Sequence, residues 1–490
     1  LAGFTIFQAG LSTVVSIAVG IAVAWALDRI AFPGRAAFVA VLSTGLVLPA
    51  LVVAFGVVAV WGRGGWINAM LTAVAGARLP GTVFGLHGIV LAHVILNGAF
   101  AARVFYDRLA ALPARRLRLG RALALPPPTR FLVLDWPAIR AAIPGLAAVI
   151  FLFCFTSFAV VLTLGGTPAN STFEVAIYEA VRFDFDLGLA ARLALIQLAI
   201  CLVVILPAAG WPLGAALVGR PHAAPHWPDG GWARPIQITV IAGAAALFGL
   251  PMAAVLGGGI APGALAVLAG PAFGTALATS LTVAGLSAVL AVSLALMLSL
   301  ARADLALLGA TGAGGLGRLR PLLLAPAFAY LATPALVLAL GFFLLARLAG
   351  VAPAVAAPAI LVLANALLAL PLCAAVLGPP LERLSARTAR LQRSLALPAR
   401  RRLAGIELPL IRPELGYAAA IAFCVSMGDL GVIALFGTTE FSTLPWLMYR
   451  AMGAYRTADA AVVAAALFAI TVIAFIAIPR LVAGPRHAQA

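Results

Sequence analysis

Eleven apolar runs, separated by short polar loops, constrain the fold of this chain more than any other feature of its sequence. A helix needs about 20 apolar residues to cross the hydrocarbon core of a bilayer. The runs lie at 4–27, 38–61, 83–105, 141–164, 189–210, 235–257, 273–300, 321–346, 355–378, 414–436 and 459–479. Charged residues make up only 10% of the chain, whereas about a quarter of a soluble domain is charged. The sequence therefore predicts an all-α integral membrane protein with about 11 transmembrane helices.

The arginines indicate how these helices are oriented. The formal net charge is +17, and all of the positive charge is arginine because lysine is absent. Most arginines fall in one set of alternate loops, and the opposite loops hold only Arg63, Arg78, Arg182, Arg192, Arg347, Arg450 and Arg456. Positive loops stay on the cytoplasmic side, so we expect a multi-pass protein whose Arg-rich loops face the cytoplasm. Clustering in short loops between apolar runs also argues against nucleic acid as a partner.

One Arg-rich loop occurs twice. Residues 118–140 align without a gap with residues 390–412, and both copies contain the motif Leu-Ala-Leu-Pro in the same register. Both copies face the cytoplasm, so the two halves of the chain are parallel repeats that can enclose a pathway. We predict two homologous helical-bundle halves, at 1–212 and 235–490, joined by a cytoplasmic linker at 213–234. Because the first half has five predicted helices and the second has six, a twelfth helix is expected before Leu1.

The repeated loop predicts a short helix that docks on another protein. A helix beginning near Arg118 or Arg390 would carry a narrow apolar stripe on a basic surface, and Pro126 or Pro398 would end it. Such a helix suits a groove on a cytoplasmic partner, although a basic loop also binds anionic membrane lipid. The expected docking residues are Arg118, Leu119, Arg121, Leu123, Ala124, Leu125 and Pro126 in the first copy, and Arg390, Leu391, Arg393, Leu395, Ala396, Leu397 and Pro398 in the second.

The spacing of this loop resembles the cytoplasmic EAA loop of ABC importer permeases. In that family a glycine and then a Leu-Pro pair follow a Glu-Ala-Ala triplet at fixed distances, and the loop carries the coupling helix that sits on an ATPase subunit. Here Ala124 and Ala396 stand at the glycine position, while Pro137 and Pro409 stand at the proline of the Leu-Pro pair. The chain departs from the family at the triplet, which reads Arg-Leu-Gly in the first copy and Arg-Leu-Gln in the second.

Several other stretches are similar to the fused permease of the bacterial thiamine ABC importer. They lie at 157–166, 177–197, 427–437 and 449–462, and the resemblance covers almost the whole chain. It implies a multi-pass protein of the bacterial inner membrane, an importer of the type I permease fold that moves thiamine and its phosphates from the periplasm to the cytoplasm. The implied partners are two copies of a cytoplasmic ATPase subunit, a periplasmic thiamine-binding protein and membrane lipid. ATP hydrolysis would belong to the ATPase, so this chain is expected to be no enzyme and to need no cofactor.

Three other classes of protein are alternatives to this interpretation: a membrane enzyme, a secondary transporter and an ABC permease for another cargo. A membrane enzyme would need a catalytic motif, and the sequence contains no HExxH, GxSxG or Walker lysine. A secondary transporter would work without an ATPase partner. Within the ABC class, the alternative is the fused permease of a ferric iron importer. The four cysteines lie inside apolar runs without metal-ligand spacing and are interpreted as small core residues.

The acid most clearly inside an apolar run is Asp429, and Ser157 occupies its position in the first half. An ionisable group at that depth needs a partner or contact with water. A carboxylate there would attract the cationic thiazolium ring of thiamine, so Asp429 and Ser157 are candidates for the translocation pathway. The alternative is a structural role for Asp429, such as capping a broken helix.

Buried amides and outer acids complete the set of candidates. Asn97 and Asn365 are expected to join helices rather than to contact cargo. The outer segments contrast in charge with the basic inner loops, and they are expected either to contact the binding protein or to lie as amphipathic helices at the membrane surface. The residues assigned to this outer contact are Glu174, Tyr178, Glu179, Tyr449 and Tyr455.

Overall fold

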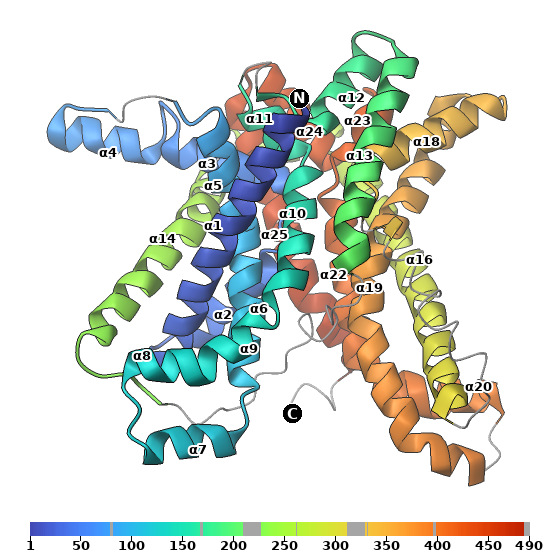
Figure 1. The fold of residues 1–490 in the computed structure, drawn as a ribbon. Coiled ribbons are helices and arrows are strands. Elements are labelled where there is room, and N and C mark those ends of the chain that lie inside the picture. The colour runs from blue at the N-terminus through green and yellow to red at the C-terminus, as the bar shows by residue number, and fades with distance from the viewer. Residues whose placement is uncertain are drawn as a thin grey trace.

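The chain folds into two bundles of helices whose Arg-rich loops lie at one end (Figure 1). The computed structural model describes residues 1–490 except 79–81, 167–169, 209–226, 261, 311–328, 331, 395–397 and 485–490. Every regular element in this described part is helical. We call the end that carries α7 and α20 the inner end, and the end that carries α12 and α24 the outer end.

The first half contains fifteen elements within the described ranges. They are α1 (Ala2–Arg29), α2 (Arg35–Thr44), α3 (Ala50–Trp61), α4 (Trp66–Ala75), α5 (Leu86–His93), the π-helix η1 (Val94–Gly98), α6 (Ala99–Ala110), α7 (Ala114–Ala122), α8 (Pro127–Arg130), the π-helix η2 (Phe131–Asp135), α9 (Trp136–Arg140), α10 (Ile143–Phe155), α11 (Ala159–Leu164), α12 (Phe173–Arg182) and α13 (Leu187–Ala208).

The second half repeats much of this order. Its elements are α14 (Ala233–Gly258), α15 (Ala264–Leu268), α16 (Pro271–Ala310), α18 (Ala335–Leu348), α19 (Pro353–Ser394), α20 (Ala399–Arg402), the π-helix η6 (Leu403–Glu407), α21 (Leu408–Leu410), α22 (Arg412–Met427), α23 (Gly431–Phe436), α24 (Leu444–Gly453) and α25 (Thr457–Ala483). The series from η6 to α25 follows the series from η2 to α13 in the register of the sequence repeat.

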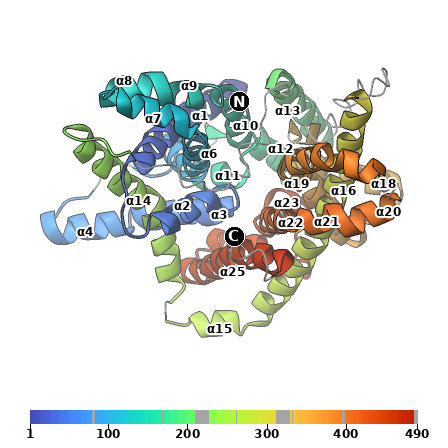
Figure 2. The ribbon, with the colours of Figure 1, turned by 90° about the horizontal axis from the view of Figure 1, so that it is seen from below.

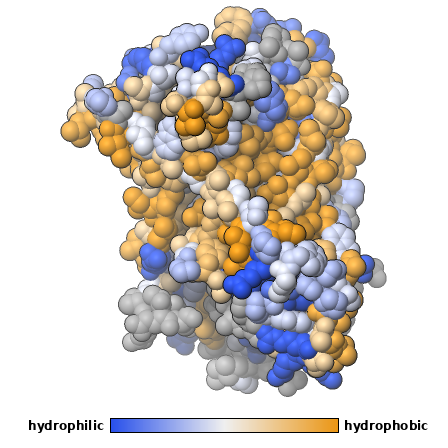
Figure 3. Space-filling view, turned by 90° about the vertical axis from the view of Figure 1, so that its left-hand side faces the viewer, coloured by the Kyte–Doolittle hydropathy of each residue, from blue (hydrophilic) through white to orange (hydrophobic). Residues whose placement is uncertain are grey.

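Nine helices in the described part are long and apolar enough to cross a membrane, and one bent pair at 127–140 and 143–155 makes a possible tenth. The predicted run at 321–346 begins in residues outside that part and continues in α18. Three other predicted spans are interrupted: 38–61 between α2 and α3, 141–164 after α10, and 414–436 after α22. Figure 3 shows a broad hydrophobic zone between more hydrophilic ends, as expected where lipid tails surround the protein.

Small residues let the main helices approach closely. α1 packs on α6 and α10, and in the second half α16 packs on α19 and α22. A Cβ added at Gly20 of α1 would lie 2.6 Å from the Ala101 Cβ of α6, and one at Gly416 of α22 would lie 2.7 Å from the Pro479 Cα of α25. Close backbone contact of this kind is how membrane helices associate when lipid supplies no hydrophobic driving force between them.

Two equivalent connections tie the halves together. Each leads into the sequence Pro-Ala-Leu-Val, at 49–52 and at 334–337. Val47 of the first half packs in a core cluster that otherwise belongs to the second half, and Ala332 of the second half packs in the corresponding cluster of the first. The exchange was not predicted from the sequence, although the repeated Pro-Ala-Leu-Val motif is a signal for two equivalent connections.

Helix α14 contacts both halves. It follows the linker in sequence, but it packs on α1 and α3 of the first half as well as on α25. Seen from the inner end, it runs beside the first-half helices (Figure 2). The domain boundary at 235 therefore stays a prediction about sequence repeats, because α14 is not confined to one bundle.

Candidate functional site

The first inner loop carries the predicted docking helix, with different ends from those expected. α7 begins at Ala114, directly after Pro113, and not near Arg118. It ends at Ala122, before Pro126, because Ala124 adopts a left-handed conformation with φ 47°. The Leu125 N–H then donates to the Gly120 carbonyl at 3.2 Å, and the Ala124 N–H to the Arg121 carbonyl at 3.0 Å. This is the Schellman arrangement, in which glycine is the usual left-handed residue.

This geometry gives a physical reason for the glycine position in the EAA-like pattern. The residue there must adopt positive φ to turn the chain away from the helix, and glycine does so at the lowest conformational cost. Ala124 occupies the position in this chain and keeps the same turn. Its counterpart Ala396, with Leu395 and Leu397, lies outside the described residues.

The apolar stripe predicted for the first loop is on the surface. The side chains of Leu119 and Leu123 are 61% and 64% exposed. Leu117 and Gly120 are the buried residues of α7. The other predicted docking residues, Arg118, Arg121, Ala124 and Pro126, are exposed as well, and Leu125 is half-buried. The first loop thus has exposed leucines between exposed arginines, which is the kind of surface expected of a docking helix.

The second inner loop is built differently. Arg390, Leu391 and Arg393 lie in the last turns of α19, a helix of 42 residues, so the prediction of a separate short helix is wrong here. The residue that matches Pro113 is Ser385, which keeps its backbone N–H and allows the helix to continue. The side chains of Arg390, Leu391 and Arg393 are outside the described part. Pro398, the last residue of the repeated motif, is exposed.

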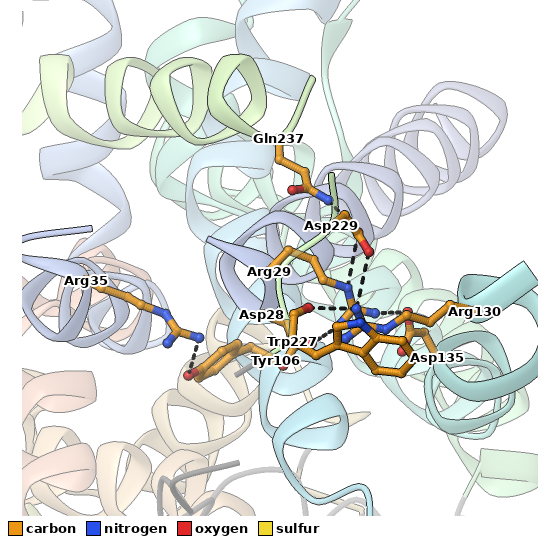
Figure 4. Close-up of polar contacts among 9 residues, drawn as sticks. All are labelled: Asp28, Arg29, Arg35, Tyr106, Arg130, Asp135, Trp227, Asp229 and Gln237. Carbon is orange, nitrogen blue, oxygen red and sulfur yellow. Dashed lines mark hydrogen bonds and ion pairs between the residues drawn. The ribbon is translucent and has the colours of Figure 1, made fainter. Parts of the chain in front are cut away.

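An ion-pair network buries charge behind the first loop (Figure 4). Arg130 of α8 donates to Asp229 Oδ1 at 3.2 Å and to the Trp227 carbonyl at 2.6 Å, so two residues from the C-terminal end of the linker reach this loop. Arg29, at the end of α1, pairs with Asp28, with Asp135 of η2 and, at 3.4 Å, with Asp229. Arg29 and Asp135 are buried almost completely, so these charges depend on one another.

The second loop has a smaller network. Arg402 occupies the position that matches Arg130, and it pairs with Asp304 at 2.9 Å and with Glu407 at 3.1 Å. Glu407 matches Asp135 in the repeat. Burial raises the pKa of the Glu407 carboxyl, and Arg402 partly opposes this rise. The hydrogen bond to Asp304 raises the pKa of Arg402 above its ordinary value.

Asp429 lies in the break between α22 and α23. Its Oδ1 accepts the Gly431 N–H at 3.1 Å, and its Oδ2 accepts the Val432 N–H at 3.2 Å. These bonds cap the first turn of α23, which is the structural role that the sequence left open. Ser157 lies in the matching break between α10 and α11 and is half-buried. Attraction of a cationic cargo by Asp429 stays a prediction.

Two of the predicted outer contacts are not on the surface of this structure, and their contact with a binding protein stays a prediction. The Glu174 side chain is fully buried, and its Oε1 accepts a hydrogen bond from Gln197 of α13 at 3.1 Å. Tyr178 is 3% exposed. α12 turns this face inward because its apolar residues and Glu174 share one side of an amphipathic helix. Glu179 and Tyr455 are exposed and Tyr449 is half-buried, so these three remain candidates.

Tyr178 and Tyr449 occupy equivalent positions in the two halves, and their phenol groups lie near enough for each to influence the pKa of the other. Burial is the main cause that raises the pKa of Tyr449 to about 12, and the neighbouring Tyr178 adds to it. Close by, Arg182 of α12 donates to the Gly437 carbonyl at the end of α23, at 3.5 Å. The halves therefore meet directly at the outer end, a contact that matching positions alone could not predict.

The predicted structural amides are confirmed as links between helices. Asn97 of η1 donates to Cys154 Sγ of α10 at 3.3 Å, and Asn365 of α19 donates to Ser426 Oγ of α22 at 3.0 Å. Cys154 and Ser426 match in the repeat. All four cysteines are buried, as expected of small core residues.

Duplicated bundles, paired Arg-rich loops at one end and a direct contact between the halves at the other define the inner-membrane permease subunit of an ABC transport system. Comparison with known proteins gives the family within this class. The chain belongs to the thiamine transport system permease proteins.

The relatives cover most of the chain. It is similar to the thiamine transport system permease protein ThiP of Escherichia coli (strain K12), with 37% identity over 98% of this chain and 88% of the relative. The ThiP protein of Salmonella typhimurium is 37% identical over 99% of this chain and 89% of its own length. ThiP of Haemophilus influenzae is 34% identical over 96% and 86%. No family model matches the chain. Nothing in these comparisons supports the ferric iron alternative.

Proposed function

We propose that this chain is the channel of a thiamine importer, and that two ATPase subunits dock on its two inner loops. The observation that carries the proposal is the first loop, where Leu119 and Leu123 stand exposed on a short helix whose turn places a left-handed residue at the glycine position of the EAA pattern. The names of the relatives support thiamine as the cargo. A periplasmic thiamine-binding protein would deliver it at the outer end.

The arrangement of charge supports an orientation with the outer end in the periplasm and the two loops in the cytoplasm. The acids Glu179 and Asp184 lie at the outer end and the arginines of the two loops lie at the inner end. ATP binding would draw the two docked subunits together, and the loops would pass this movement to the bundles. This chain would form the translocation pathway, while the ATPase subunits would hydrolyse ATP.

Uptake of labelled thiamine tests the cargo. Cells that lack their own thiamine permease are supplied with this chain and its ATPase and binding protein, and thiamine, thiamine phosphates and ferric iron are compared. We expect saturable thiamine uptake that stops when the ATPase is inactive. Uptake of iron alone, or thiamine uptake that continues without the ATPase, would reject the proposal.

A second experiment tests the docking surface. Leu119→Asp with Leu123→Asp places two charges in the proposed apolar contact, and desolvating them would weaken docking by roughly a hundredfold or more. The control is Leu348→Asp, since Leu348 is 85% exposed and belongs to α18, a helix that lies away from the inner loops in Figure 1. Co-purification of the ATPase with each permease variant measures the effect. Equal recovery of the ATPase with both variants would exclude this surface.

The outer contact offers a test of the pathway. If cargo passes between the halves, then Tyr178→Cys with Tyr449→Cys should stop uptake under oxidising conditions and recover it after reduction. Each single cysteine variant serves as the control, because it cannot form the cross-link. Unchanged uptake by a fully cross-linked protein would show that the path lies elsewhere.

A further inference from the structure

We propose that Trp227 and Asp229, at the C-terminal end of the linker, are positioning residues that hold the first inner loop ready for its partner. The proposal rests on the proposed function, because it assumes that the loop docks on an ATPase subunit. It assigns to the linker a task beyond joining two halves of a fused chain.

Helix α7 has little tertiary support of its own. Only Leu117 and Gly120 are buried among its nine residues, and the rest of the helix faces solvent. A helix of this length is not stable in isolation in water, so its orientation depends on the few contacts that it makes. The contacts at Gly120 are therefore important for the orientation of α7.

Trp227 supplies one of these contacts. A Cβ added at Gly120 would lie 3.0 Å from the Trp227 ring and 2.9 Å from Leu134 Cδ1, so the indole lies directly against the backbone of α7. The Arg130 guanidinium stacks over the same ring at 3.8 Å, and that of Arg121, which belongs to α7, lies 5.7 Å from it. The indole thus joins α7 to α8 through cation–π contacts as well as packing.

Asp229 fixes the linker end in place. Its Oδ1 accepts from Arg130 at 3.2 Å, its Oδ2 accepts from Gln237 of α14 at 2.8 Å, and Arg29 of α1 lies 3.4 Å away. Its side chain is only 4% exposed. Removing this carboxylate would leave Arg29 and Arg130 close together with less compensating charge, as their position around Asp229 in Figure 4 shows. The linker end is therefore held by α1, α8 and α14 together.

The second loop is held without such a segment in the described part of the chain. There the arginine equivalent to Arg130, Arg402, pairs with Asp304 of the membrane helix α16 and with Glu407 of its own loop. The loop also continues from α19 without a break. The orientation of the second loop is therefore set by α19 itself. Helix α7 is separated from α6 at Pro113, so it needs a contact from another segment to fix its orientation.

The test compares Trp227→Ala with Trp227→Phe in the full complex of permease and ATPase. We expect Trp227→Ala to weaken ATPase binding roughly tenfold, the order of a half-buried cation–π contact with its packing, and Trp227→Phe to restore most of it. The control is Trp232→Ala, because Trp232 belongs to the same linker but is 59% exposed. Substitution of Asp229 by Asn should act in the same direction as Trp227→Ala.

A local probe separates positioning from general loss of fold. A spin label on Leu119→Cys should become more mobile in the Trp227→Ala protein, while the same label on Leu348→Cys should not change. An unchanged Leu119 label together with unchanged ATPase affinity would overturn the inference, even if the wild-type complex forms. Failure of the wild-type permease to bind the ATPase would instead reject the proposed function. A variant that unfolds would show both labels mobile, and Trp227→Phe then decides the question.

Discussion

In the first inner loop, Arg130 pairs with an aspartate of the linker, whereas in the second loop the matching Arg402 pairs within its own half. The acids match as well, but Asp135 pairs with Arg29 of α1, whereas Glu407 pairs with Arg402 of its own loop. The π-helix between arginine and acid is the same in both loops. The comparison teaches that the repeat preserved the π-helix of the loop while the ionic partners diverged.

The linker gives a reason for this divergence. A fused chain has one linker between its halves, and its end lies on the first loop, where it brings Asp229 into the buried cluster. The second loop uses Asp304, whose side chain is 44% exposed. Its network is therefore closer to water and less dependent on exact pairing. Four predictions test how far the two halves differ.

The largest difference is expected for the two arginines. Arg130→Ala removes a cation that is about 1% exposed and leaves Asp229 buried, which should cost about 3–5 kcal/mol of folding free energy. Arg402→Ala should cost about 1–2 kcal/mol, because Arg402 is 21% exposed and burial already raises the pKa of the Glu407 carboxyl. Thermal unfolding of both variants in one detergent measures the gap. Equal losses would contradict the asymmetry of the two networks.

The next effect concerns the continuity of α19. Ser385→Pro should break this helix where α6 and α7 are separated in the first half, at a cost of about 3 kcal/mol. The reverse change, Pro113→Ser, should cost much less because it restores an N–H at a position that is already the start of a helix. Unfolding temperatures of the two variants measure the difference. A larger loss for Pro113→Ser would show that the break in the first half is required by packing.

A smaller effect is expected at the turn after α7. Ala124→Gly should stabilise the protein by about 0.5–1 kcal/mol, because glycine reaches φ 47° without a Cβ penalty. Gly3→Ala is a control for the general cost of exchanging these two residues, since a Cβ there meets nothing within 4 Å. A shift of the unfolding midpoint measures the gain, and destabilisation by Ala124→Gly would mean that the left-handed turn does not persist in solution.

The smallest effect compares two equivalent hydrogen bonds. Asn365→Ala removes a bond to a hydroxyl, which in membrane proteins is worth about 0.6 kcal/mol on average. Asn97→Ala removes a bond to sulfur, a weak acceptor, and should cost less. The double variants Asn365→Ala with Ser426→Ala and Asn97→Ala with Cys154→Ala complete the two mutant cycles. A larger coupling energy for the pair with sulfur would reverse the expected order.

Several features of the site were predictable from the sequence because they depend on neighbouring residues. The exposed leucines Leu119 and Leu123 follow from a short apolar stripe among arginines, and the broken helix at Asp429 was foreseen as one of two alternatives. The ends of α7 were not foreseen, since the turn at Ala124 is set by a left-handed backbone that alanine seldom adopts. The burial of Glu174 also escaped prediction, because its partner Gln197 lies on the next helix.

The sequence by itself determined the class of protein, the orientation of its loops and the existence of two repeated halves. Apolar length, arginine position and register are local properties, and each can be read without knowing which helices meet. Only the tertiary structure decided that Arg29, Asp135 and Asp229 share one buried cluster, that Val47 and Ala332 cross into opposite cores, and that Arg182 reaches the carbonyl of Gly437. These contacts join residues far apart in the chain, and the free energy that selects them arises only when charges and side chains are desolvated together.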